Sequence, residues 1–231
     1  MLVNKYIESL KDSGDKNKYR YIKKQYQRQL DYLISLPINS KKLYTYIIVI
    51  SVLLISICLF AFNTETSVII KLIYSLPGIV FSIISFILYN KVYKSDFKDK
   101  KLFQKYRIFE LLAINTMFLD GSYFFQTIIY TDLGNKEYTK LLGLLSIFEI
   151  ITVYISLKNC PKKFLREFAG DKIKYNREGR IGWIIFGIII IVNATKPYRI
   201  LLIGCYYMIL LMTYYIVYDI YKLSKYDLMF K

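Results

Sequence analysis

Two acidic residues lie within long apolar stretches of this sequence, where a charge is costly. Asp120 is about twelve residues into the stretch 108–130, and Glu149 is about nine residues into the stretch 141–157. If the two stretches form antiparallel helices, a rise of about 1.5 Å per residue puts both carboxyl groups roughly 17 to 18 Å from the same end. An acid at the middle of a bilayer costs about 2.5 to 3.5 kcal/mol on the insertion scale, so these residues need an explanation.

Such a pair of carboxyl groups could bind a cation, relay a proton or receive a basic group of a substrate. Alternatively, one or both acids are protonated and structural, or Asp120 forms an ion pair with Lys71 of the stretch 67–89. We favour the structural interpretation, because the sequence has no His and no further acids that would continue a relay. Glu110 and Asp219, near the ends of apolar stretches, are expected to reach headgroups and basic neighbours.

Enzyme chemistry has little support in this sequence. It has no zinc-ligand cluster, no His to act as a base, no Gly-x-Ser-x-Gly motif and no P-loop. Its three cysteines, Cys58, Cys160 and Cys205, are odd in number and are expected to be buried thiols. We therefore expect a protein that is not an enzyme and that uses no metal or cofactor. Any ATP hydrolysis that drives it would take place in a partner chain.

The elements that carry the acids are predicted to be membrane-spanning helices. The chain is 55% hydrophobic, yet it has 33 Lys and Arg against 17 Asp and Glu. Apolar blocks long enough to cross about 30 Å of hydrocarbon alternate with short basic segments. We therefore predict an all-α, polytopic membrane protein with about six transmembrane helices arranged as three hairpins. The predicted spans are 43–62, 67–89, 108–130, 141–157, 181–194 and 200–221.

The distribution of basic residues predicts the orientation of these spans. The segments outside the three hairpin turns hold 28 of the 33 Lys and Arg, the turns hold 4, and the last is Lys71. Because basic residues keep short loops in the cytoplasm, we expect a multi-pass plasma-membrane protein with both termini cytoplasmic. The net charge of +16 then suits a lipid bilayer with anionic headgroups rather than nucleic acid. The block 181–194 reaches only about 21 Å and could be re-entrant.

Residues 1–42 are expected to form a basic cytoplasmic segment, before a transmembrane domain at 43–221 and a cytoplasmic tail at 222–231. Apolar side chains recur every three or four residues in the first segment, which predicts an amphipathic helix lying in the cytoplasmic membrane interface. Pro37 is expected to end this helix. The alternative is an ordinary lead-in to the first span that has no partner. The stripe consists of Tyr19, Ile22, Tyr26, Leu30 and Leu33.

Pro77 and Gly78 interrupt the second predicted span. A proline inside a helix removes one backbone hydrogen bond and bends the helix. We expect a static kink here rather than a hinge.

Residues 32–44, YLISLPINSKKLY, resemble a cytoplasmic motif that precedes a transmembrane helix in many permeases of type-two ABC exporters of Gram-positive bacteria. The resemblance implies a six-span half-transporter with an interfacial amino-terminal helix, which dimerises with itself or with another permease. It also implies coupling to a separate ATPase through the elbow region, including Lys41 and Lys42, and the loop 90–107. Peptides, lipids and antibiotics would be plausible cargo. The matching residues are Leu36, Pro37, Ile38, Asn39, Lys41 and Lys42.

Two other functions stay open. A non-catalytic immunity or accessory protein would bind a toxin or another membrane complex, with the amino-terminal segment as its docking element. A membrane enzyme would have to rely on Asp120, Glu149, Tyr and Lys side chains alone. The exporter permease is our leading hypothesis.

Overall fold

All regular structure in the described part of the chain is α-helical, which confirms the predicted all-α class for these residues. The fifth predicted span, 181–194, lies outside the described residues, and so does Pro37. The computed structural model describes residues 2–12, 15–35, 38–62, 67–130, 135–168 and 197–230.

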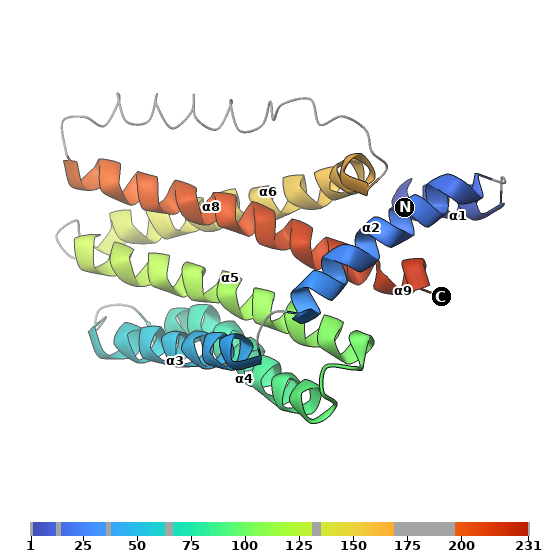
Figure 1. Cartoon of the computed structure of the whole chain (residues 1–231). Coiled ribbons are helices and arrows are strands. Elements are labelled where there is room, and N and C mark those ends of the chain that lie inside the picture. Colours follow the sequence, from blue (N-terminus) through green and yellow to red (C-terminus); the bar gives the residue numbers. More distant parts are fainter. Residues whose placement is uncertain are drawn as a thin grey trace.

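In the described part of the chain, the long helices α3, α4, α5, α6 and α8 lie side by side and form a bundle, and shorter or oblique helices gather at one end of it (Figure 1). Within the bundle, α4 packs against α3 and α5, α5 also packs against α8, and α8 packs against α6. The helices are α1 (Leu2–Asp12), α2 (Lys16–Ser35), α3 (Ile38–Phe62), α4 (Val68–Lys94), α5 (Lys100–Tyr130), α6 (Asn135–Phe168), α8 (Pro197–Ser224) and α9 (Tyr226–Phe230).

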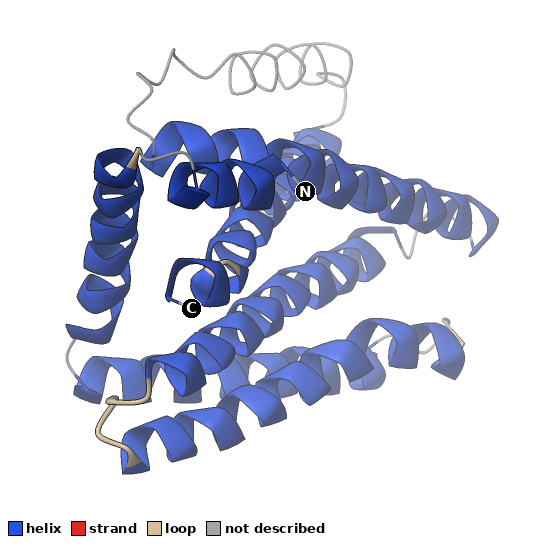
Figure 2. Ribbon diagram, turned by 90° about the vertical axis from the view of Figure 1, so that its right-hand side faces the viewer, coloured by secondary structure: helices blue, strands red, loops and turns tan. Residues whose placement is uncertain are grey.

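Both chain ends lie at the same end of the bundle in Figure 1, and this end faces the viewer in Figure 2. We call it the basic end. It comprises α1, α2, α9 and the segments 91–107, 158–168 and 222–225, which sequence analysis assigned to the cytoplasmic side. The positively charged segments, far apart in the sequence, are therefore together in space.

Two helices in the described part of the chain are long and apolar enough to cross a membrane. They comprise Lys41–Ala61 in α3, with a mean hydropathy of 2.6, and Val68–Lys94, which is α4, with a mean hydropathy of 2.0. Both correspond to predicted spans. Membrane spans and the core helices of soluble proteins share these two features.

The packed face of α4 is polar or small, whereas its outer face is apolar. Ile69 and Ile73 are 70% and 64% exposed, while Ser82 is fully buried. Small side chains let helices approach closely inside a membrane bundle, and the surface of such a bundle faces hydrocarbon. The buried positions recur every three or four residues and are Lys71, Ser75, Gly78, Ser82, Ser85, Tyr89 and Val92.

The helices α5 and α6 extend beyond the predicted spans. The segment 90–107, expected to be a loop, consists of the last turn of α4, a short connection at 95–99 and the first two turns of α5. Similarly, α6 continues to Phe168, eleven residues past the predicted end of its span. Hydropathy marks only the apolar part of a helix, and Lys and Arg have good helix propensity, so the basic flanks continue the helices.

The predicted amphipathic helix is α2, which crosses the basic end obliquely (Figure 1). Its apolar stripe faces the protein: Ile22, Tyr26 and Leu30 are buried. Tyr19 packs with the aromatic cluster of α6 and α9, and Leu33 packs beside Leu30. The apolar stripe therefore exists as predicted. It packs against the ends of the bundle helices, however, whereas the sequence predicts that it contacts the membrane interface.

Candidate functional site

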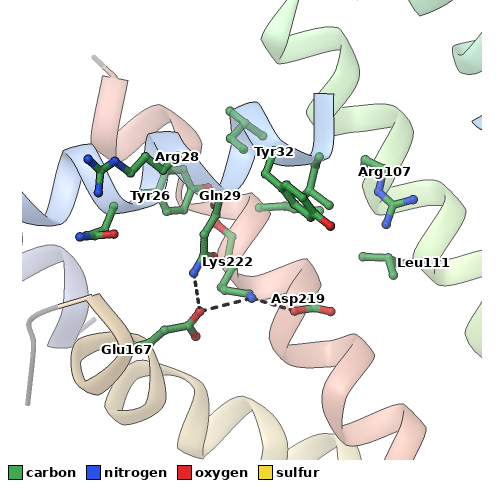
Figure 3. Close-up of a pocket in the computed structure, with 13 residues that line it drawn as sticks. Tyr26, Arg28, Gln29, Tyr32, Arg107, Leu111, Glu167, Asp219 and Lys222 are labelled. Carbon is green, nitrogen blue, oxygen red and sulfur yellow. Dashed lines mark hydrogen bonds and ion pairs between the residues drawn. The ribbon is translucent and has the colours of Figure 1, made fainter. Parts of the chain in front are cut away.

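A pocket of about 460 Å³ lies at the basic end, between α2 and the ends of α5, α6 and α8 (Figure 3). This volume is in the range of small-molecule sites. Leu30, Leu33, Leu111 and Leu223 supply its apolar lining. Charged, amide and tyrosine side chains line the rest of it. The pocket is therefore amphipathic, and α2, α5 and α8 each supply both polar and apolar side chains to its lining.

An ion-pair network holds three helices together along the pocket wall. Nζ of Lys222 lies 3.0 Å from Oδ1 of Asp219 and 3.7 Å from Oε1 of Glu167. The same Oε1 accepts a hydrogen bond of 2.9 Å from Nε2 of Gln29, and the Tyr218 hydroxyl donates to Oε2. Glu167 of α6 thus connects α2 with α8. Figure 3 shows Lys222 between the two carboxylates.

Tyr26 anchors α2 to the rest of the basic end. Its ring centroid lies 5.6 Å from that of Phe168, 5.9 Å from Phe230 and 6.2 Å from Phe164. Its hydroxyl donates a 2.6 Å hydrogen bond to the carbonyl oxygen of Lys222. Burial raises the pKa of Tyr26 well above its usual range, with a smaller contribution from nearby Tyr226. At neutral pH the hydroxyl therefore remains a donor.

Lys163 of α6 lies against three tyrosine rings of α8. Its Nζ is 4.2 Å from the ring centroid of Tyr218, 4.6 Å from Tyr215 and 5.0 Å from Tyr214. Such cation–π contacts are attractive, and they strengthen where water is excluded. Burial lowers the pKa of Lys163, against an opposing effect of Glu167 and Asp219. The contact joins α6 to α8 next to the pocket.

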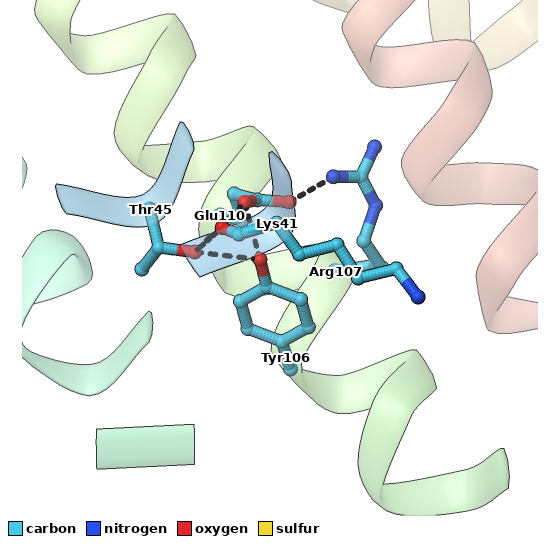
Figure 4. A network of polar contacts seen from close by, with 5 residues as sticks. All are labelled: Lys41, Thr45, Tyr106, Arg107 and Glu110. Carbon is cyan, nitrogen blue, oxygen red and sulfur yellow. Dashed lines mark hydrogen bonds and ion pairs between the residues drawn. The ribbon is translucent and has the colours of Figure 1, made fainter. Parts of the chain in front are cut away.

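Glu110 is fully buried in a polar network at the start of the bundle, although we expected it to reach the headgroups (Figure 4). It accepts hydrogen bonds from the Tyr106 hydroxyl, at 2.5 Å, and from the Arg107 guanidinium. The hydroxyl groups of Thr45 and Tyr106 are 2.8 Å apart, which connects α3 with α5. Burial and the Glu110 carboxylate raise the pKa of Tyr106 above its usual range. The basic neighbour expected for Glu110 is therefore present as Arg107, but the carboxylate that it contacts is buried in the protein.

The two lysines of the exporter-like motif point in different directions. Lys41 is buried, donates to the carbonyl oxygen of Ile34, and places Nζ 4.3 Å from the ring centroid of Phe97. Lys42 is exposed. Lys41 therefore fixes the connection between α2 and α3, and only Lys42 is accessible to a partner.

Asp120 is fully buried on α5, and neither of its carboxylate oxygens has a hydrogen-bond partner in the described part of the chain. It faces Gly78 and Thr116 rather than Lys71. Lys71 is buried too, and its Nζ lies 5.7 Å from the ring centroid of Phe60. Seven residues separate Lys71 from Gly78, about 10 Å along α4, which accounts for the absence of an ion pair with Asp120.

Glu149 lies on α6 between the exposed residues Phe148 and Ile150. It is half-buried, and its Oε1 has no hydrogen-bond partner among the described residues. In the described region α6 packs mainly against α8, and no hydrogen bond joins Glu149 to Asp120. The structure does not assemble the two acids into one site.

Of the residues that line the pocket, Tyr26, Leu30 and Leu33 belong to the stripe predicted from the sequence. The charged and amide residues were not predicted as a site, because each looks like an ordinary polar residue of a basic segment. One local signal was available: Asp219 and Lys222 have the spacing of an ion pair on one helix face. The contributions of Gln29, Arg107 and Glu167 arise only from tertiary packing. No family model matches the chain, and neither a curated protein nor a solved structure does.

Proposed function

We propose that this chain is a multi-pass membrane protein that acts as the permease subunit of an exporter, energised by a separate ATPase. The observation that carries this proposal is the docking of α2. Its apolar stripe is fixed to α6, α8 and α9, and its opposite face is exposed at the basic end. A helix attached in this way can transmit a force from a peripheral partner to the bundle.

The membrane part of the proposal is supported by the apolar surface of the bundle. Beyond α3 and α4, the helix α6 also exposes large apolar side chains, including Ile147, Ile150 and Tyr154, while Ser156 is buried. This distribution is the reverse of that of a soluble helix, where polar residues face outward. The distribution supports insertion of α6 into the membrane, although the length and composition of α6 alone do not identify it as a span.

The proposed orientation places the basic end in the cytoplasm. Exposed basic residues at the ends of α4, α5 and α6 support it, since positive charge favours the cytoplasmic side. A reporter fused after Thr66 or after Glu137 should be exported, whereas one fused to the C-terminus should stay in the cytoplasm. A cytoplasmic reporter at either internal position would rule out the three-hairpin topology. The exposed basic residues are Lys91, Lys94, Lys98, Lys101, Lys105, Lys158, Lys162 and Arg166.

The permease part is tested by purifying the full chain from its native membrane in a mild detergent. Co-eluting proteins are identified by mass spectrometry, and ATPase activity is measured. We expect a stoichiometric nucleotide-binding subunit. Arg20→Glu combined with Lys24→Glu should release it, because both side chains are exposed on α2 and have no partner within the described chain.

The matched control is Lys162→Glu, which reverses an exposed charge at the same end but on α6. It should leave the complex intact. A chain that elutes alone, or with a toxin or another membrane complex, would refute the permease function and favour an immunity or accessory protein instead.

A further inference from the structure

Around the pocket at the basic end, most of the polar groups that lack a partner are hydrogen-bond donors. Its two acids are compensated: Glu167 accepts from Gln29 and Tyr218 and lies near Lys222, and Asp219 pairs with Lys222. These contacts leave the carboxylates little need for a cationic ligand.

The two arginines that line the pocket are less well compensated. Arg28 is exposed, and its side chain makes no hydrogen bond or ion pair with the described residues. Arg107 contacts Glu110 through Nη1, but its Nε is buried without a partner. In Figure 3 the two guanidinium groups lie at opposite sides of the pocket, outside the network around Lys222. An anion is therefore the ligand that the pocket lacks.

The exposed face of α2 extends this positive charge away from the pocket. Basic side chains recur there every four residues, so they form one stripe along the helix, about 18 Å long. All four are exposed, and none is paired with an acid of the described chain. Lys18 and Lys23, by contrast, lie over the rings of Tyr6 and Phe230. The stripe consists of Lys16, Arg20, Lys24 and Arg28, the last of which lines the pocket.

The apolar part of the pocket adds a second requirement. Four leucines from α2, α5 and α8 line it, and the pocket lies next to the point where α2 leads into α3. A purely polar anion would leave these leucines uncovered. A ligand with both a phosphate group and an aliphatic part can contact the arginines and the leucines at once. Guanidinium groups bind phosphate oxygens through charge-assisted hydrogen bonds, and the aliphatic part covers the leucines.

We propose that this pocket binds a phosphate-bearing amphiphile, with Arg28 and Arg107 contacting the phosphate-bearing headgroup and the leucines contacting the aliphatic part. The ligand has two potential sources, an anionic phospholipid of the membrane and a soluble phosphate ester. The site does not depend on the exporter function, because binding is a property of the isolated chain.

The test uses the full chain, delipidated in a non-ionic detergent, and native mass spectrometry. It is titrated with dioctanoyl phosphatidylglycerol, with glycerol 3-phosphate and with inorganic phosphate. Arg28→Gln should weaken binding about tenfold, as loss of one charged hydrogen bond would. Arg20→Gln is the matched control: it removes the same charge from the same stripe, two turns away and outside the pocket, and should change the affinity less than about twofold.

The outcomes separate the sources. Saturable binding of the lipid alone, lost in Arg28→Gln, identifies a phospholipid headgroup. Binding of glycerol 3-phosphate that is as tight as that of the lipid, and that Leu33→Trp weakens by filling the apolar part, identifies a soluble phosphate ester. Equal binding of inorganic phosphate, or binding of either ester that Leu33→Trp leaves unchanged, would overturn the amphiphilic ligand. No saturable binding, or equal losses in Arg20→Gln and Arg28→Gln, would overturn the proposal.

Discussion

Asp120 on α5 lies directly against Gly78 on α4, so closely that a Cβ atom on Gly78 would be 2.9 Å from Oδ2 of Asp120. The same atom would be 3.2 Å from Oγ1 of Thr116 and 3.3 Å from Cγ1 of Val52. Three helices therefore meet where α4 has no side chain. The sequence predicts that this glycine takes part in a kink at Pro77, and the structure gives it a packing role.

Gly78→Ala should destabilise the bundle, because Asp120, Thr116 and Val52 must all move. We expect a loss of about 1 to 3 kcal/mol, typical of overpacking, seen as a lower thermal unfolding midpoint in detergent. Gly121→Ala on α5 is the control, since its Cβ would meet only Cδ1 of Ile55, at 3.9 Å. Adding Asp120→Ala to Gly78→Ala should recover part of the loss. Equal effects of the two glycine substitutions would contradict this packing argument.

Tyr26→Ala should detach α2 from the bundle. The substitution removes a ring packed against three phenylalanines and a hydrogen bond to the backbone of Lys222. Losses of about 3 to 5 kcal/mol are usual for such large-to-small changes. Hydrogen exchange of the α2 amides should accelerate more than that of α4. Tyr21→Ala, at a 49% exposed position of the same helix, should change neither.

Tyr26 should also make the protein sensitive to alkali. The unfolded chain releases this proton near the ordinary pKa of 10.0, whereas the folded chain keeps it to higher pH because burial raises the pKa. The contribution to the free energy of unfolding is complete below about pH 10 and is lost as the pH rises further. Tyr26→Phe should therefore lower stability slightly at neutral pH but flatten its decline above pH 10.

The unfolding midpoint measured between pH 8 and pH 11.5 checks this expectation. Tyr21→Phe serves as the control and should keep the wild-type slope. A Tyr26→Phe profile parallel to that of the wild type over the whole range would show that the Tyr26 proton is not linked to folding.

Substitutions of the adjacent Lys41 and Lys42 should have very different effects on the free energy of unfolding. Lys41→Gln removes the contacts with Ile34 and with the Phe97 ring, so we expect a loss of about 1 to 3 kcal/mol. Lys42→Gln should alter stability by less than about 0.5 kcal/mol, because its side chain is exposed. Chemical unfolding in detergent measures both variants. Similar losses in the two would mean that Lys41 is not a structural residue.

Sequence patterns located the helices well where the signal is local. The apolar stripe of α2 and the two long apolar helices α3 and α4 follow from periodicity and hydropathy, which depend on neighbouring residues only. The basic extensions of α5 and α6 were not predicted, because a hydropathy pattern does not identify a helical turn made of charged residues. The candidate site was predicted less well: Asp120 is fully buried, but neither Lys71 nor Glu149, which we considered as its partners, forms an ion pair or hydrogen bond with it.

The sequence alone determined the all-helical class, the segregation of basic residues from apolar blocks and the amphipathic character of α2, because each is a pattern along one segment. Only the tertiary structure decided which surface the stripe of Tyr26 covers, that Glu110 and Lys41 lie inside the protein, and that Arg28, Arg107 and Lys222 line one pocket. These features depend on distances between helices far apart in the chain, and the packing of whole helices sets those distances.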